Sequence, residues 1–292
     1  MEVRMQEKIL LEDIIQRFGK KEALKGITLH VKSGEIFGLL GPSGAGKTTI
    51  IKIMTGQLRP DQGSALIDGM AADRMTGTVY RRIGMMMDTP GLYARLSCYD
   101  NLKLFARLYE IPESRIREVL QKVGLTEAAG RPVDKLSKGM KGRLALARAV
   151  MNEPDILFLD EPTSGLDPAT TGQIHELILE EQAKGTTVFL TTHNMAEAEK
   201  LCGHIALLCE GSIVEEGGPQ EICRRYNHRK RIRIRLYDGR NLEIGCGKET
   251  ECDEKTAEVI KEYLKQGMVE TIHSTEPNLE TVFLELTGRK LD

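Results

Sequence analysis

A glycine-rich segment, residues 41–49 (GPSGAGKTT), constrains the fold of this chain more than any other part of the sequence. It follows an apolar stretch, residues 35–40, that predicts a strand, and it leads into residues 48–55, whose lack of breakers predicts a helix. The spacing Gly-x4-Gly-Lys-Thr between such a strand and helix is typical of a phosphate-binding loop, whose glycines let backbone amides surround phosphate oxygens. The flanking elements argue against the alternative, a glycine-rich turn with a chance lysine.

The residues of this loop have separate expected tasks. Lys47 should reach the β- and γ-phosphates of a nucleotide, and the Thr48 hydroxyl should ligate Mg²⁺. The other residues of the loop are expected to surround the nucleotide: Gly41, Pro42, Ser43, Gly44, Ala45, Gly46 and Thr49.

A second apolar segment, residues 156–161 (ILFLDE), ends in two acids. It predicts a buried strand that places Asp160 and Glu161 beside the phosphate loop. Asp160 would then hold Mg²⁺ through water, and Glu161 would orient or deprotonate the attacking water. Paired acids at a strand end can also cap a helix, but the PTSGLD that follows and the later TTH favour the catalytic interpretation.

His193 follows a predicted strand, residues 186–192, and is expected to donate to the γ-phosphate. A single histidine is more often structural, and the remaining ones are interpreted in that way: His30, His175, His204, His228 and His273.

A second phosphate-binding turn is predicted at residues 136–140 (LSKGM). Ser137 and Gly139 open a predicted helix at residues 140–151, and the start of a helix offers backbone N–H groups to phosphate. One chain therefore carries two phosphate-binding ends.

The composition narrows the possible partners. Lys and Arg number 41 against 43 Asp and Glu, a balance that gives no indication of a nucleic-acid partner. No apolar run approaches the roughly 20 residues of a membrane-spanning helix, and residues 1–13 lack a signal-peptide core, so a membrane role is expected to depend on a partner. The six cysteines include no CxxC pair and are interpreted as reduced thiols of a cytosolic protein.

Alternating strand and helix patterns predict a P-loop NTPase of the α/β class with a mainly parallel sheet. Short strands in residues 1–40 predict an antiparallel β subdomain, and apolar residues at helical spacing predict a helical subdomain at about residues 90–150. We expect the ATPase domain to span residues 1–220 and a small α+β accessory domain to span residues 221–292. Within the accessory domain, residues 231–237 alternate Arg with Ile or Leu. An amphipathic strand explains this pattern more simply than binding to anionic lipid or RNA.

In their order and spacing, these motifs resemble the ATP-binding subunit of an ABC transporter, from about Phe18 to His193. The resemblance implies that adenine stacks on Phe18 and that residues 164–167, including Asp167, form a dimer-contact loop. It also implies that the LSKGM turn acts in trans, with Ser137, Gly139 and Met140 binding the γ-phosphate of ATP held by a second copy. Because both halves of the site are intact, a two-fold homodimer with two ATP sites is expected.

Asp88 departs from most of this family, whose members carry a glutamine that senses Mg²⁺ and touches the membrane subunit at this position. An acid there resembles the bacitracin- and lantibiotic-type resistance exporters. We interpret Asp88 as adding charge at the Mg²⁺ site; the alternative is a cap of the turn TPG.

The C-terminal segment, residues 276–292, resembles ATPases that serve drug- and antibiotic-exporting permeases, and its residues 279–286 predict an amphipathic helix that could also dock on the ATPase core. The expected function is therefore ATP hydrolysis that drives export of a small amphiphilic drug or antimicrobial peptide through a separate permease, on the cytoplasmic face of the membrane. An importer ATPase and a soluble ABC-type ATPase are the alternatives.

Overall fold

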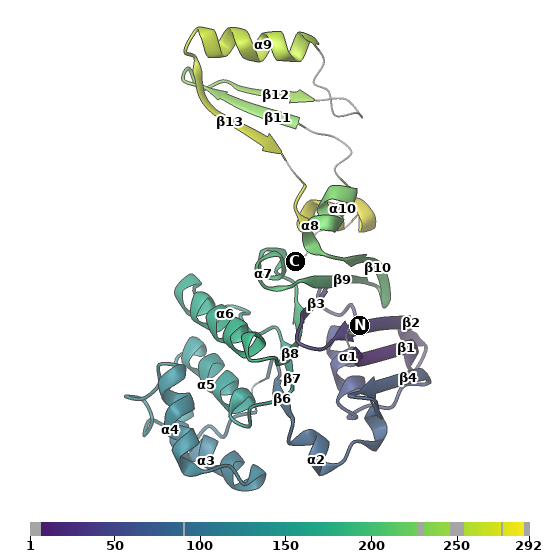
Figure 1. Ribbon diagram of the computed structural model, residues 1–292, viewed down its shortest axis with the longest axis vertical. Helices are drawn as coiled ribbons and strands as arrows, with labels where there is room; N and C mark the ends of the chain where they lie inside the picture. Colours follow the sequence, from purple (N-terminus) through teal and green to yellow (C-terminus); the bar gives the residue numbers. More distant parts are fainter. Residues whose placement is uncertain (1–6, 90, 227–230, 246–253, 276, 289–292) are drawn as a thin grey trace, which may run out of the picture. The chain divides into compact units, whose positions relative to one another are not determined.

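The computed structural model describes residues 7–89, 91–226, 231–245, 254–275 and 277–288 (Figure 1). The chain divides into two compact units, one ending at Gly218 and one beginning at Pro219, and each is described by itself.

A six-stranded sheet in the order β10-β9-β3-β8-β7-β6 forms the centre of the first unit. All neighbouring pairs from β9 to β6 are parallel, and only β10 runs antiparallel, to β9. The carboxyl ends of the parallel strands therefore meet at one edge, where ligands bind in sheets of this type. The strands are β3 (Ile36–Leu40), β6 (Ile83–Met86), β7 (Ile156–Asp160), β8 (Thr187–Thr192), β9 (His204–Cys209) and β10 (Ser212–Gly217).

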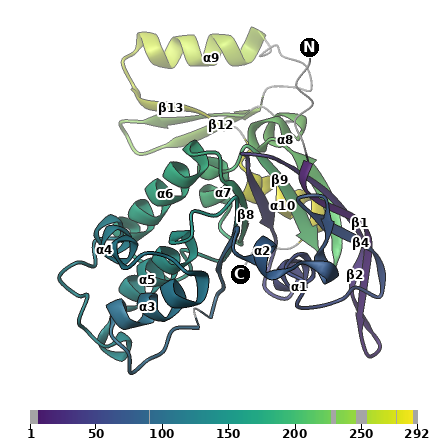
Figure 2. The same ribbon diagram turned by 60° about the horizontal axis from the view of Figure 1, so that its bottom comes forward.

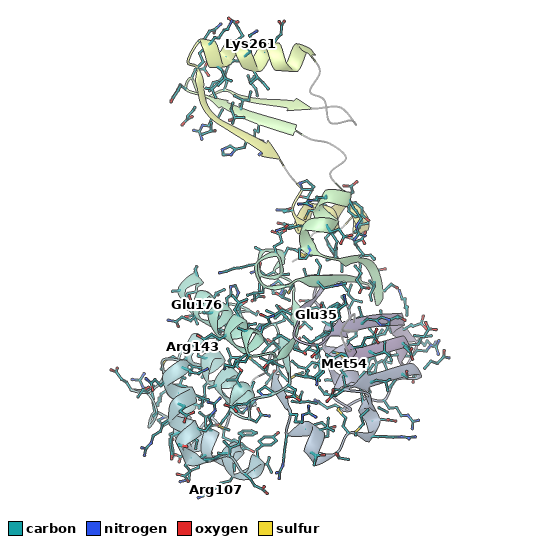
Figure 3. All side chains as sticks on the ribbon, in the orientation of Figure 1. Glu35, Met54, Arg107, Arg143, Glu176 and Lys261 are labelled. Atoms are coloured by element: carbon teal, nitrogen blue, oxygen red, sulfur yellow. The ribbon has the colours of Figure 1, made fainter. Side chains whose placement is uncertain are left out.

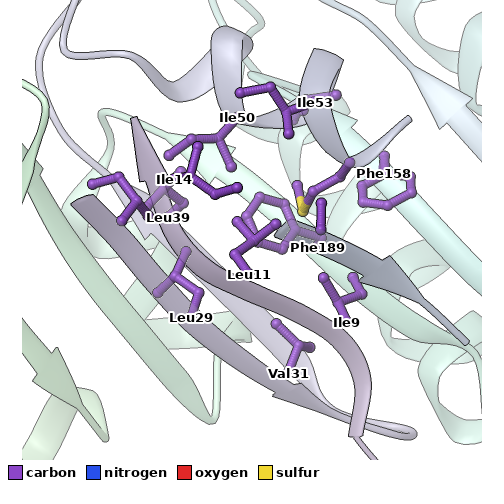
Figure 4. Packing of buried hydrophobic residues seen from close by; sticks show 14 of the residues in the cluster. Ile9, Leu11, Ile14, Leu29, Val31, Leu39, Ile50, Ile53, Phe158 and Phe189 are labelled. Carbon is purple, nitrogen blue, oxygen red and sulfur yellow. The ribbon is translucent and has the colours of Figure 1, made fainter. Parts of the chain in front are cut away.

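The second sheet of this unit is antiparallel, in the order β2-β1-β4-β5. Its apolar face and the central sheet enclose helix α1 (Figure 4), so that Ile50 and Ile53 of α1 pack in one core with Ile9, Phe158 and Phe189. Because these side chains are almost completely buried, the start of α1 is held firmly between the two sheets. The elements are β1 (Glu7–Phe18), β2 (Lys21–Lys32), β4 (Gln62–Ile67), β5 (Met70–Ala71) and α1 (Lys47–Met54).

The helices α3 to α6 gather on the side of the central sheet away from the antiparallel sheet (Figure 2). Arg143 of α5, labelled in Figure 3, donates through Nη1 to the carbonyl of Val123 at the end of α4 over 2.9 Å. The helices of the first unit are α2 (Gly77–Tyr80), α3 (Cys98–Tyr109), α4 (Glu113–Lys122), α5 (Lys138–Val150), α6 (Pro168–Ala183) and α7 (Met195–Leu201), with 3-10 turns at Ala72–Arg74 and Val133–Lys135.

Strand β6 and helix α5 approach closely at Gly84. A Cβ atom there would lie 2.1 Å from the carbonyl oxygen of Ala149, so one element must shift to admit it. We expect Gly84→Ala to lower the free energy of unfolding by about 1–3 kcal/mol, measured by urea denaturation. Gly172→Ala on α6 is the control, because a Cβ there meets no described atom within 4 Å; a loss of equal size there would contradict the prediction.

The second unit holds a three-stranded antiparallel sheet in the order β12-β11-β13. Ile234 and Leu236 are fully buried while Arg233 is exposed, so the alternation of β11 has the two faces expected of an amphipathic strand. Helix α10 contacts α8 within this unit. The elements are α8 (Pro219–Arg225), β11 (Arg231–Leu236), β12 (Asn241–Gly245), α9 (Glu254–Lys265), β13 (Val269–Thr275) and α10 (Leu279–Thr287).

The predicted α/β class, the mainly parallel sheet and the antiparallel β subdomain are confirmed. Strands β6, β10, β12 and β13 and helix α8 were not predicted from the sequence. Helix α5 begins at Lys138 rather than at residue 140, because the Ser137 hydroxyl caps the helix and draws Gly139 and Met140 into its first turn. His228 lies outside the described residues. Among the described residues, no helix is long and apolar enough to cross a membrane.

Candidate active site

A cleft of about 340 Å³ opens at the carboxyl edge of the central sheet, beside the start of α1. It brings together most of the residues that the sequence assigned to ATP and Mg²⁺, although these come from four separate segments of the chain. Its lining consists of Phe18, Lys21, Ala23, Ser43, Gly44, Gly46, Lys47, Thr48, Thr49, Asp88, Asp160 and Glu161.

The phosphate loop is fixed by close backbone packing. A Cβ atom at Gly41 would lie 2.3 Å from the carbonyl oxygen of Leu208, and Gly46 has φ 119°, a left-handed conformation that favours glycine. Gly46 is also the N-cap of α1. The first backbone N–H groups of that helix have no partner within the helix, and they lie next to the cleft. This arrangement fits the phosphate groups of a nucleotide.

Lys47 is buried at the base of the loop, with 6% of its surface exposed. Its ammonium group donates to the carbonyl of Gly41 over 2.6 Å and lies 3.1 Å from Oε1 of Glu161. A buried ammonium held by a carbonyl and a carboxylate supplies positive charge in a fixed place, which suits it to bind an anionic phosphate.

Asp160 ends strand β7 and is almost completely buried, with 1% exposure. Its Oδ2 accepts from the Thr48 hydroxyl over 3.0 Å, and its Oδ1 accepts from the Thr191 hydroxyl over 2.5 Å. Carboxylate and hydroxyl oxygens are the ligands that Mg²⁺ prefers, so Thr48 and Asp160 fit a magnesium ion held directly or through water.

Glu161 leaves the strand in a left-handed conformation, with φ 52°. Such a backbone is uncommon for residues other than glycine and costs roughly 1–3 kcal/mol, a strain that often marks functional sites. The bend lets the Glu161 backbone N–H donate to the Thr191 carbonyl while Oε2 lies 2.7 Å from Nδ1 of His193. The carboxylate is thereby oriented by Lys47 and His193, as expected of a residue that positions or deprotonates water.

Four other predicted residues, Ser137, Gly139, Met140 and Asp167, lie at two helix starts. The Ser137 hydroxyl caps α5 by accepting from the Met140 N–H over 3.2 Å, and Asp167 caps α6 by accepting from the Thr170 N–H over 3.0 Å. The bond from the Thr170 backbone lowers the pKa of Asp167 below its usual range. A Cβ at Gly139 would lie 3.1 Å from the Thr170 side chain, so the two helix starts are neighbours.

None of Ser137, Gly139, Met140 or Asp167 is among the residues that line the cleft in the described part of the chain. Within one chain the structure therefore separates the phosphate loop and the acids from the second phosphate-binding turn.

Sequence reasoning missed Thr191 as a site residue. The available signal was a threonine in the apolar strand 186–192, because a hydroxyl inside a buried strand needs a partner and the neighbouring strand ends in an acid. Lys21 and Ala23, which also line the cleft, carry no comparable signal.

A phosphate loop at a helix start, beside two acids at the end of a neighbouring strand, defines a P-loop ATPase domain. The sequence model of the ABC transporter family matches residues 24–164. A fluoroquinolones export ATP-binding protein of Mycobacterium tuberculosis (strain CDC 1551 / Oshkosh) is 42% identical, with 92% of this chain and 89% of that protein covered. The linearmycin resistance ATP-binding protein LnrL of Bacillus subtilis (strain 168) is 33% identical, with 96% and 98% covered.

Solved structures agree with these sequence comparisons. An ATP-binding subunit of an ABC transporter superposes with a TM-score of 0.69 at 30% identity, covering 75% of this chain and 92% of that one. A dimeric ATP-binding cassette in a post-hydrolysis state, bound to ADP and Pi, superposes with a TM-score of 0.66 at 28% identity, covering 72% and 98%. The chain belongs to the ABC transporter family and carries its ATPase domain, as the sequence motifs predicted.

Proposed function

We propose that this chain energises export of a small amphiphilic drug or antimicrobial peptide through a separate membrane permease. The observation that carries the proposal is its relatedness, over nearly its whole length, to proteins named for fluoroquinolone export, linearmycin resistance and bacitracin transport. On this proposal the ATPase unit lies on the cytoplasmic face of the membrane, and residues 221–292 form an accessory domain. An importer ATPase, the alternative, would carry the same catalytic groups.

The residues that the sequence assigned to ATP and Mg²⁺ have separate proposed roles in ATP hydrolysis. Phe18 lines the cleft and is 53% exposed, so an adenine ring could stack on it. Lys47 and the loop amides bind phosphate, and Thr48 with Asp160 would hold Mg²⁺. When bound there, Mg²⁺ would neutralise charge on the phosphates. Glu161 orients or deprotonates water, and His193, which contacts that carboxylate, donates to the γ-phosphate.

The active form is proposed to be a two-fold homodimer. The turn at Ser137 and Gly139 and the loop carrying Asp167 lie apart from the cleft, so they are available to a second copy. Two-fold symmetry then completes two equivalent sites at once, with Ser137, Gly139 and Met140 of one protomer facing the ATP held by the other.

Export is tested by purifying the chain together with its membrane permease and measuring ATP hydrolysis in liposomes. We expect amphiphilic drugs to stimulate hydrolysis, and we expect cells that produce the chain and the permease to become more resistant to those drugs. Stimulation that requires a solute-binding protein would identify an importer instead, and the ATPase assignment would stand in either case.

Asp88 lines the cleft together with Thr48 and Asp160, and we propose that its charge contributes to Mg²⁺ binding. Asp88→Gln removes that charge, so the Mg²⁺ concentration needed for half-maximal hydrolysis should rise about tenfold. A Mg²⁺ titration at saturating ATP measures this. Asp73→Asn, an acid outside the cleft, should leave the titration unchanged; if Asp88→Gln does so too, Asp88 has no role at the metal.

A further inference from the structure

Behind the cleft, three polar side chains from different elements meet in the interior. Oε1 of Glu197, on α7, accepts from the Thr163 hydroxyl over 2.7 Å and lies 3.1 Å from Nε2 of His175, on α6. The exposed fractions are 8% for Thr163, 5% for His175 and 2% for Glu197. Thr163, His175 and Glu197, here called the buried cluster, are not used by any step of ATP hydrolysis described above.

The buried cluster is only partly satisfied. Oε2 of Glu197 and Nδ1 of His175 are buried without a hydrogen-bond partner among the described residues. Because an ionised carboxylate only accepts, Nε2 of His175 is assigned as the donor to Glu197. A buried carboxylate with one unpaired oxygen costs free energy, whereas an apolar side chain of similar size in its place would carry no such cost. Stability therefore does not explain the arrangement.

The location of the buried cluster suggests its role. Thr163 follows the catalytic Glu161 by two residues and lies in the turn that leads to Asp167. Glu197 lies four residues after His193, in the first turn of α7, which Asn194 caps by accepting from the Glu197 N–H over 3.2 Å. Two links thus join the same two segments: Glu161 to His193 at the cleft, and Thr163 to Glu197 in the interior.

We propose that Thr163, Glu197 and His175 are positioning residues that fix the loop of residues 161–167 against the segment that carries His193. The interior link adds a second fixed point, away from the cleft, to the contacts that Glu161 makes with Thr191 and His193. His175 holds Oε1 of Glu197 toward Thr163. A displacement of His193 is thereby transmitted to the loop that ends at Asp167. The affinity of the phosphate loop for ATP does not depend on the buried cluster.

The test separates turnover from ATP binding. Thr163→Val removes the hydroxyl with little change of shape, and His175→Leu removes the imidazole. Because small misplacements of catalytic groups are costly, each variant should lower kcat about 10- to 100-fold while KM for ATP stays within about twofold. Steady-state hydrolysis by the full-length chain measures both constants, and thermal unfolding defines the temperature at which all variants remain folded.

Conservative replacements provide the rescue. Thr163→Ser keeps the hydroxyl, and the amide nitrogen of His175→Gln can reach the place of Nε2, so both should retain most of the wild-type kcat. The shorter side chain of His175→Asn cannot reach Glu197 and should behave like His175→Leu. Thr163→Val with wild-type kcat would overturn the proposal, as would equal losses in the valine and serine variants. If the wild-type chain itself does not respond to drugs, the proposed export fails but this inference does not.

Discussion

Replacing Glu161 with glutamine is expected to lower the rate of ATP hydrolysis by about 10²- to 10⁴-fold without weakening ATP binding. The carboxylate is the cleft's candidate general base, fixed between the ammonium of Lys47 and the imidazole of His193. Glutamine keeps the shape and both contacts but cannot accept a proton from water. ATP should then hold two copies of the variant together, and phosphate release with gel filtration in MgATP measures the two effects.

A matched control lies on the surface of α6. Glu176, labelled in Figure 3, is exposed and outside the cleft, so Glu176→Gln removes the same charge without touching the site. It should hydrolyse ATP at the wild-type rate and show no stable ATP-bound dimer. Normal hydrolysis by Glu161→Gln would mean that another group activates water.

The parts of the site that could be predicted from sequence are those formed by short motifs of consecutive residues. The segment 41–49 specifies its own loop because glycines and a helix start must occur in a fixed order, and residues 156–161 specify a buried strand with acids at its end. Parallel pairing of β3, β8 and β7 then brings the two together, as α/β topology requires.

The parts that could not be predicted depend on register between distant segments. Thr191 meets Asp160 because they are paired residues of neighbouring strands, and His175 meets Glu197 because two helices converge. His175 was interpreted as structural, since a single histidine in an amphipathic helix carries no sign of its partner. Strand β6 was missed for a related reason: it is a short edge strand, Ile83–Met86, without alternation.

If the active form is the proposed dimer, mixing two inactive variants should restore part of the ATP hydrolysis. Lys47→Ala disables the phosphate loop, and Ser137→Arg blocks the turn that serves the other protomer. In a mixed dimer, the loop of the second variant faces the turn of the first, so one site is intact and the other is doubly disabled. Random pairing makes half of the dimers mixed, and independent sites should therefore recover about a quarter of the wild-type rate in an equimolar mixture.

The control for this mixture must separate helix capping from phosphate binding. Ser97 caps α3 as Ser137 caps α5, each accepting from the backbone N–H three residues later. Ser97→Arg therefore carries the same loss of a cap, about 0.5–2 kcal/mol, but should hydrolyse ATP normally. Because Lys47→Ala and Ser137→Arg should each be inactive alone, recovery would require that Ser137 act on ATP held by a different chain. An equimolar mixture without recovery, in which mixed dimers are demonstrated by affinity tags, would contradict a symmetric dimer with two independent shared sites.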